Sequence, residues 1–207
     1  MPGKHHCIPA SVAGEDTASR TFLPHFGFPS ASASAGTHTG HMRQRITPAV
    51  PGPGQESVWD YPRPPRVETG SGRIRIFLGG ELILDTTDWL RVLETSHPPV
   101  YYLPRAAFLP GALESAQGTS WCEFKGQAEY FTVRGGGRSA ERAAWSYPQP
   151  LPGYAELAGR VAVYAGPMDR CEVNGEVARP QAGGFYGGWV TDQVVGPFKG
   201  EPGTLGW

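Results

Sequence analysis

The stretch RIRIFLGGELILD, residues 73–85, decides the fold class of this chain. Charged and apolar residues alternate over residues 73–77, as they do in a strand with one buried face. Gly79 and Gly80 then supply a tight turn, and residues 81–85 return as a second β-rich run. We therefore predict an antiparallel β-hairpin.

Similar short runs follow toward the C-terminus, punctuated by Gly and Pro. We expect strands at residues 100–104, 121–124, 128–133, 138–147 and 160–164. Asn174-Gly175, between residues 171–173 and 176–177, is typical of a type I′ hairpin turn. Residues 89–93 fit a strand or a short helix, and residues 154–159 fit one or two helical turns.

The composition agrees with these patterns. The chain has 29 Gly and 21 Pro, together 50 of 207 residues or about 24%, whereas about 12% is usual. Both residues interrupt helices, which excludes a helical bundle or coiled coil, and no βαβ alternation indicates a Rossmann fold. Because 39% of the residues are hydrophobic, a core can form. We predict a mainly β fold: a single compact, rolled antiparallel sheet domain with short helical turns.

Composition also divides the chain. Residues 1–54 hold seven Gly, seven Pro and five of the six His without hydrophobic periodicity, so we expect a disordered N-terminal tail. Because Met42 opens a stretch that reads as a natural start, we hypothesise that residues 1–41 come from an over-extended gene model. We assign residues 55–180 to the β-domain. Residues 181–207, rich in Gly and aromatic residues, should form an arm packed on the domain or on a partner subunit.

Charge and cysteine content restrict the function. The 18 Lys and Arg offset 19 Asp and Glu, for a net charge of -1 without a basic stripe, so we expect no nucleic-acid binding. No apolar run approaches the roughly 20 residues that span a bilayer, so we expect no membrane partner. Cys7, Cys122 and Cys171 form no CxxC pair, which disfavours a disulfide scaffold and a zinc site. We expect a cytoplasmic protein with no metal site, and the sequence identifies no cofactor.

The segment LETSHPPVYY, residues 93–102, contains the first candidate site residues. Glu94, His97, Tyr101 and Tyr102 lie around a Pro-Pro bend, where a carboxylate, an imidazole and two phenols suit acid–base chemistry. The alternative is that Glu94 satisfies backbone donors at the bend and the tyrosines pack in the core.

Two further segments supply the remaining candidates. In TSWCEFKG, Cys122 is the candidate nucleophile and Lys125 the candidate anion contact. Strand alternation would place them on opposite faces unless Gly126 ends the strand with a bulge, and Cys122 could equally be a structural cysteine. In AAWSYPQP, Trp145 and Tyr147 share a strand face and could line an aromatic pocket with Tyr101 or simply fill the core.

These segments together carry a family resemblance. The stretches ETSHPPVYY, SWCEFKG and AWSYPQP, with GGFYGGWVTDQVVGPFKGEPGTLGW, resemble the actinobacterial branch of domain-of-unknown-function family 427, which is also labelled nucleotidyltransferase-like. The resemblance runs from about residue 55 to residue 207 and implies a β-tent-like domain. The sequence lacks the paired CxxC motifs that hold zinc in other β-tent proteins. The resemblance transfers no catalytic residues.

Three functions are compatible with these features. The leading one is a cytoplasmic β-domain with one small-molecule pocket, for which a nucleotide-like ligand is a candidate. In this pocket Tyr101, Lys125, Trp145 and Tyr147 would bind the ligand. The second is a thiol- or acid–base-dependent enzyme using Cys122, His97 and Glu94, or a nucleotidyltransferase as the family label suggests. The third is a structural module that forms a homodimer through residues 181–207.

Overall fold

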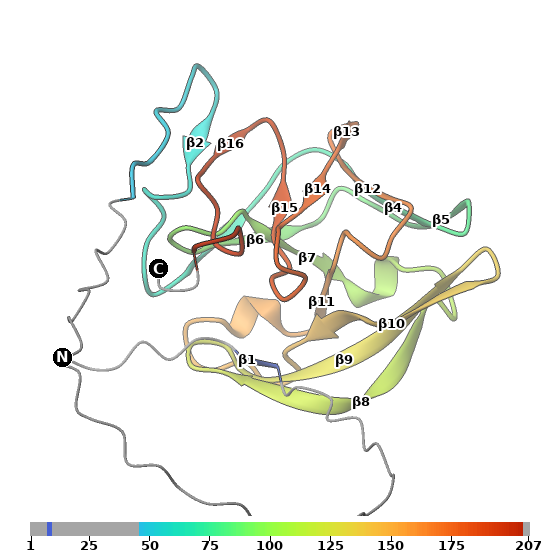
Figure 1. The fold of residues 1–207 in the computed structure, drawn as a ribbon. Helices are drawn as coiled ribbons and strands as arrows, with labels where there is room; N and C mark the ends of the chain where they lie inside the picture. Colours follow the sequence, from blue (N-terminus) through green and yellow to red (C-terminus); the bar gives the residue numbers. More distant parts are fainter. Residues whose placement is uncertain (1–7, 10–45, 205–207) are drawn as a thin grey trace, which may run out of the picture. The chain divides into compact units, whose positions relative to one another are not determined.

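A computed structural model describes residues 8–9 and 46–204 of the chain (Figure 1). These residues form mainly β-structure, which confirms the predicted fold class. The helical segments among them are two single 3₁₀ turns, η1 (Arg105–Ala107) and η2 (Ala155–Leu157). None of the helices in the described part is long and apolar enough to cross a membrane.

The larger sheet is antiparallel and contains eight strands (Figure 1). Its strands, in spatial order, are β1 (Ile8–Pro9), β8 (Leu113–Cys122), β9 (Gly126–Gly135), β10 (Arg138–Ser146), β11 (Arg160–Val163), β7 (Val100–Pro104), β6 (Leu90–Leu93) and β3 (Arg66–Thr69). Of residues 89–93, which fitted a strand or a helix, residues 90–93 form a strand. The consecutive strands β8, β9 and β10 form a long meander.

The smaller sheet contains the hairpin predicted from residues 73–85. Its order is β13 (Glu176–Val177), β12 (Arg170–Val173), β4 (Ile74–Leu78) and β5 (Glu81–Thr86). Gly79 and Gly80 join β4 to β5 with φ of 61° and 77°, and Asn174 and Gly175 join β12 to β13 with φ of 54° and 85°. Both turns have left-handed backbone at their two central residues, as type I′ geometry requires, so both hairpin predictions are confirmed.

Two short strand pairs complete the fold. β14 (Arg179–Pro180) pairs antiparallel with β15 (Trp189–Val190), and β16 (Val194–Val195) pairs parallel with β2 (Glu56–Ser57). The C-terminal segment thus joins the N-terminal end of the domain, and Ala49 N–H also donates to the Gly196 carbonyl at 2.8 Å.

Part of the predicted N-terminal tail can be placed. Its residues 8–9 form β1, and residues 46–54 lead into β2, whereas residues 1–7 and 10–45, with Cys7 and Met42, lie outside the described residues. Trp207 at the end of the predicted arm is also outside them. The boundaries at residues 55 and 181 stay predictions.

The central strands of the larger sheet carry apolar side chains on both faces, and each face contributes to a buried cluster. One face packs against the smaller sheet, where Leu103, Phe131 and Val163 meet Ile74 and Ile76. The opposite face forms a second cluster that is rich in aromatic side chains. That cluster contains Leu90, Val92, Tyr102, Cys122, Ala128, Tyr130, Trp145, Tyr147, Tyr154, Leu157 and Ala162. It surrounds the candidate site.

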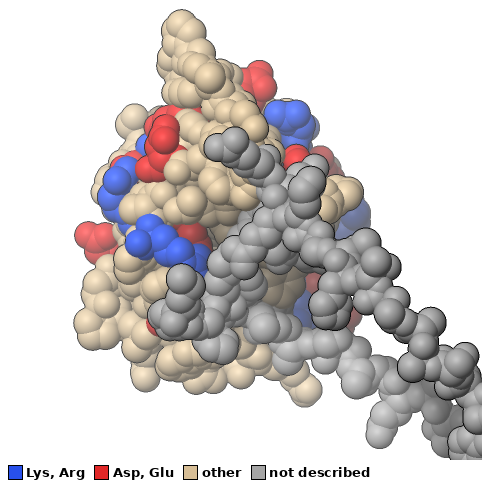
Figure 2. Space-filling view, turned by 60° about the vertical axis from the view of Figure 1, so that its left-hand side comes forward, with Lys and Arg blue, Asp and Glu red and all other residues tan. Residues whose placement is uncertain are grey.

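Many charged side chains on the surface form ion pairs. Arg73 contacts Asp85 at 2.7 Å and Arg160 contacts Asp88 at 2.8 Å. On the face shown in Figure 2, Lys and Arg stand among Asp and Glu. Positive and negative side chains are thus mixed on this face, in line with the net charge of -1. The absence of a nucleic-acid partner stays a prediction.

Candidate functional site

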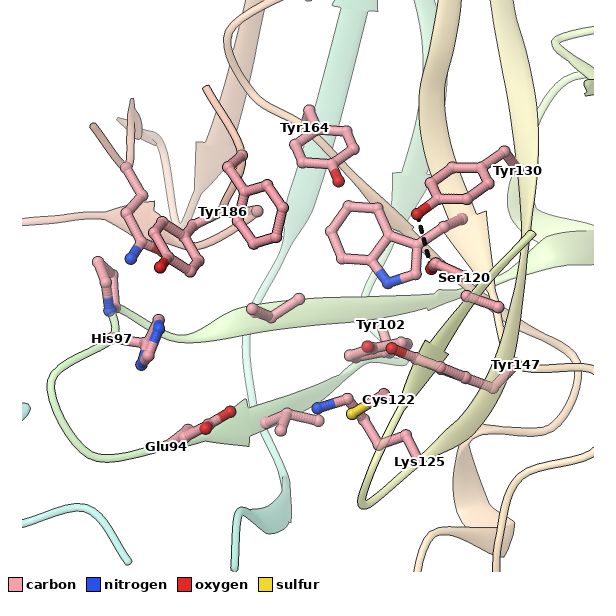
Figure 3. A pocket seen from close by; sticks show the side chains of 18 residues that line it. Glu94, His97, Tyr102, Ser120, Cys122, Lys125, Tyr130, Tyr147, Tyr164 and Tyr186 are labelled. Atoms are coloured by element: carbon pink, nitrogen blue, oxygen red, sulfur yellow. Dashed lines mark hydrogen bonds between the residues drawn. The ribbon is translucent and has the colours of Figure 1, made fainter. Parts of the chain in front are cut away.

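A cavity of about 120 Å³ lies on the aromatic face of the larger sheet, and we call it the ring pocket (Figure 3). It is enclosed by the bend after β6, by β7, by the β8–β9 turn, by β10 and by part of the C-terminal segment. Its lining comprises Val92, Glu94, His97, Pro98, Val100, Tyr102, Ser120, Cys122, Lys125, Ala128, Tyr130, Trp145, Tyr147, Tyr164, Gln181, Phe185, Tyr186 and Gly187. Six of the seven candidate site residues are among them, and Tyr101 is not.

The position of Tyr101 corrects the sequence prediction. Successive side chains of a strand point to opposite faces of the sheet. Tyr101 therefore lies in the core between the sheets, where its ring centre is 5.3 Å from that of Trp89 and 5.1 Å from that of Trp189. Its neighbour Tyr102 lines the ring pocket instead.

Cys122 and Lys125 line the same pocket because the β8 strand ends between them. Residues 123–125 form a turn, and β9 begins at Gly126 with φ of 95°. Strand alternation therefore does not extend past Cys122, and the two residues meet because the strand ends there and not because Gly126 ends it with a bulge. Both are enclosed, with exposed fractions of 1% for Cys122 and 7% for Lys125. Figure 3 shows both side chains projecting into the cavity.

Aromatic rings form most of the remaining wall. The ring centre of Trp145 lies 4.6 Å from that of Tyr164 and 6.4 Å from that of Tyr102, which is also 6.4 Å from that of Tyr147. Burial raises the pKa of Tyr164 above its usual range, so its phenol stays protonated. Tyr130 exchanges a hydrogen bond of 2.8 Å with the Ser120 hydroxyl.

Several residues that line the pocket were not predicted from the sequence. Tyr102 lies in the segment of residues 93–102, but the alternation of side chains along β7 does not show which of its tyrosines faces the pocket. Tyr164 ends the predicted strand at residues 160–164. Phe185 and Tyr186 belong to the predicted arm and reach the pocket only through the tertiary fold.

His97 stands at one end of the cavity beside Tyr186, with a ring-to-ring distance of 5.0 Å (Figure 3). Burial lowers the pKa of His97, and the neighbouring charges of Lys199 and Lys125 lower it further, against the opposing influence of Glu94. The imidazole is therefore neutral at pH 7. Its Nδ1 lies 3.0 Å from the Thr95 carbonyl oxygen. Because a carbonyl only accepts, Nδ1 carries the hydrogen and Nε2 keeps a lone pair for accepting a proton.

Glu94 is held by an arginine that sequence reasoning did not identify. Arg63 Nη1 donates to Glu94 Oε1 at 2.5 Å, and its Nη2 donates to Glu123 Oε1 at 2.7 Å. The same guanidinium lies over the Phe124 ring, 5.0 Å from its centre. Arg63 thus fixes the Glu94 carboxylate and offsets its charge. No local motif around Arg63 signalled this role.

The arrangement combines aromatic surface with a buried cation. The Lys125 ammonium lies 6.0 Å from the centre of the Tyr147 ring, and Glu94, which supplies a carboxylate to the described lining, is paired with Arg63. Such surroundings favour a planar group with electron-rich or anionic atoms. Glu94 and His97 lie at one end of the view in Figure 3, and Cys122 lies with Lys125 farther along the cavity.

The described residues were considered as ligands for a metal ion only where several donor side chains lie together. Within residues 8–9 and 46–204, no group of three or more His, Cys, Asp and Glu side chains is placed to hold a metal ion. Neither Cys122 nor Cys171 forms a disulfide.

Comparison with known families gives a match over the central part of the chain. A family model described as "Domain of unknown function (DUF427)", with the short label NTP_transf_9, matches residues 66–174. The matched segment runs from β3 through β12 and includes the candidate residues from Glu94 to Tyr147. The pocket residues Gln181, Phe185, Tyr186 and Gly187 lie beyond it. No curated protein matches this chain.

Proposed function

This chain belongs to the DUF427 family, and we propose that it binds a small planar molecule with a nucleobase-like ring in the ring pocket. The family description assigns no activity, so the proposal depends on the geometry of the pocket. The residues that carry it are Tyr102, Trp145, Tyr147 and Lys125.

The observation behind the proposal is the aromatic enclosure around a buried ammonium. Rings of Tyr102, Trp145, Tyr147 and Tyr164 are spaced 4.6 to 6.4 Å apart by their centres. Stacking on such rings stabilises any flat heteroaromatic group, and the Lys125 ammonium can donate to a ring carbonyl or a ring carboxylate. Tyr164, held protonated by burial, supplies a further donor.

The size of the cavity sets the class of ligand. Drug-sized ligands occupy roughly 300–1,000 Å³, whereas a cavity of about 150 Å³ accommodates benzene. A volume of about 120 Å³ therefore suits one ring system, with any larger substituent extending outside. This favours a nucleobase or a similar heterocycle over a whole nucleotide within the ring pocket itself.

The test is a binding panel of adenine, guanine, cytosine, uracil, orotate and the four ribonucleosides. We expect at least one ring to raise the melting temperature and to shift the Trp145 indole NMR signal. Lys125→Met keeps an apolar side chain of similar length but removes the charge. It should reduce the affinity for orotate at least ten-fold more than the affinity for uracil. A panel without any thermal or spectral shift would overturn the proposal.

A second candidate is an enzyme that uses the Cys122 thiol, with His97 or Glu94 as the proton shuttle. Its support is that all three residues line one cavity and that His97 Nε2 keeps a lone pair. Cys171 is the internal control, since it is equally buried and burial raises its pKa well above the ordinary value. In a Cys7→Ser background, the enzyme proposal requires iodoacetamide to label native Cys122 faster than Cys171. Equal labelling, seen only after denaturation, would remove this candidate.

The remaining proposals concern location and assembly. That neither Cys122 nor Cys171 forms a disulfide supports a cytoplasmic location, because disulfides are rare there. A homodimer through residues 181–207 is a third functional proposal. Deleting that segment would remove Trp189, which is 0% exposed, from the core. The better test is sedimentation of the intact chain against Phe185→Asp. A dimer that this variant dissociates supports the proposal, and a monomeric intact chain opposes it.

A further inference from the structure

A second hollow of about 540 Å³ adjoins the ring pocket, and we call it the outer hollow. The two share the lining residues Tyr130, Tyr164, Gln181 and Tyr186. The outer hollow is otherwise lined by Glu141, Arg142, Ala143, Ala165, Gly166, Pro167, Pro180, Gly184 and Gly188. Because they share these four residues, the two hollows are neighbours on the same side of the sheet.

Arg142 in the outer hollow has an unusual backbone. The register of β10 against β9 shifts between Ala140 and Ala144, and within this bulge Arg142 has φ of 49°. This left-handed conformation is uncommon for a residue with a long side chain, and such strain is concentrated at functional sites. The bulge turns the Arg142 side chain across β9.

The guanidinium of Arg142 is held in place by two strands. It lies over the Tyr130 ring, 4.1 Å from the ring centre, and Nη1 donates to the Gln117 carbonyl oxygen. On β8 a second register shift, between Ala116 and Thr119, places Gly118 beneath the guanidinium with φ of 91°. A Cβ atom at Gly118 would overlap Arg142 Nη1. Two bulges therefore make room for this one guanidinium and orient it.

The outer hollow has one charged side chain of each sign in its described lining. Among the described residues that line it, Arg142 is the cation and the exposed Glu141 is the carboxylate. A guanidinium has five N–H donors in a planar fork, and one donor here serves Gln117. The remaining donors suit bidentate contact with an oxyanion such as a phosphate.

We propose that the ligand of this protein is a ring compound with a phosphate substituent, of the nucleoside monophosphate class. Its ring occupies the ring pocket and its phosphate binds Arg142 in the outer hollow. This inference rests on the proposed function, since the ring must bind first. The outer hollow, at about 540 Å³, is large enough for a ribose and a phosphate, whereas the ring pocket, at about 120 Å³, is of the size of a ring alone.

The experiment compares each ribonucleoside with its 5′-monophosphate by isothermal titration calorimetry on the full chain. In the wild-type protein, we expect the phosphate to increase affinity at least ten-fold for the base that binds. In Arg142→Gly that gain should disappear while the nucleoside affinity stays unchanged. Glycine is the chosen substitution because it adopts φ of 49° without strain. Arg105→Gln is the matched control, since Arg105 also lies over an aromatic ring, that of Phe131 at 5.0 Å, but lines neither hollow.

Glu141→Gln provides a second, independent variant that leaves Arg142 in place. Removing the carboxylate beside Arg142 should strengthen monophosphate binding several-fold without changing nucleoside binding. A nucleoside that binds without any gain from its phosphate, or a gain that survives Arg142→Gly, overturns this inference and leaves the ring pocket proposal intact. A chain that binds none of the free bases, nucleosides or monophosphates overturns both.

Discussion

Tyr101 and Tyr102 are consecutive in β7, yet they belong to different parts of the molecule. Tyr101 packs in the core between the two sheets, within 5.3 Å of the Trp89 ring centre. Tyr102 packs on the opposite face, where its ring centre is 6.4 Å from those of Trp145 and Tyr147 in the ring pocket. The pair therefore separates effects on stability from effects on binding.

Leucine at each of these positions should give different results in binding experiments. Both Tyr101→Leu and Tyr102→Leu remove a buried ring, and we expect each to lower the free energy of unfolding by roughly 1–3 kcal/mol. Only Tyr102→Leu should reduce the affinity for the ring that binds, by at least ten-fold. Urea denaturation and calorimetry on both variants measure this. Equal losses of affinity would contradict the assignment of Tyr102 to the pocket wall.

Trp189 should be essential to stability although it lies in the predicted arm. It is fully buried, its Nε1 donates to the Val163 carbonyl at 2.8 Å, and its ring packs against Tyr101. We expect Trp189→Ala to lower the free energy of unfolding by about 3–5 kcal/mol. Trp121→Ala is the control, because Trp121 is 60% exposed, and its effect should be below about 1 kcal/mol. A similar effect of both changes would show that the arm is not part of the core.

Arg63 should affect binding more than stability. Its side chain is 40% exposed, so the ion pairs with Glu94 and Glu123 should contribute less than about 1 kcal/mol to folding. Without Arg63, the Glu94 charge at the pocket is no longer offset. Arg63→Met should therefore reduce the affinity for orotate more than the affinity for uracil, and Glu94→Gln in the same background should restore the affinity for orotate. If the affinities for the two ligands fall equally, Arg63 acts by its shape and not by its charge.

His97 should make stability depend on pH below neutrality. Because burial lowers its pKa from 6.5 in the folded state, the unfolded chain binds the proton more readily. Stability attributable to His97 is therefore constant above pH 6.5 and decreases as the pH falls through 6.5 toward the folded pKa. Denaturation of wild type and His97→Gln at several pH values should show a difference that changes in this window only. An NMR titration of His97 with a midpoint above 6.5 would oppose it.

Gly187 should be needed for close packing of the C-terminal segment on the pocket. Its φ is not left-handed, but a Cβ there would overlap the Trp145 ring. We expect Gly187→Ala to destabilise by roughly 1–3 kcal/mol and to change Trp145 fluorescence. Gly166→Ala is the matched control, since its Cβ would meet only Pro180 at an ordinary 3.7 Å. An unchanged fluorescence spectrum in Gly187→Ala would mean that this segment does not seal the pocket.

The sequence by itself determined the local elements of this protein. Hairpins at Gly79-Gly80 and Asn174-Gly175 are encoded by adjacent residues, because few residues other than Gly and Asn tolerate left-handed backbone at low cost. Proline and glycine likewise marked the ends of β7 and the single turn η2. The segments around Glu94, Cys122 and Trp145 were also predicted to surround one pocket, because they carry titratable and aromatic side chains, and residues of all three line the ring pocket.

Only the tertiary structure decided which side chains of those segments meet. Successive side chains of β7 point to opposite faces of the sheet, but the sequence does not show which face is which. Whether Tyr101 or Tyr102 faces the pocket therefore depends on which face packs against the smaller sheet. The placement of Lys125 depended on where β8 ends, and Arg63 reaches Glu94 from 31 residues away. Arg142 acquired its position from two bulges on strands that flank β9. These relationships arise from register and long-range packing, which no local pattern specifies.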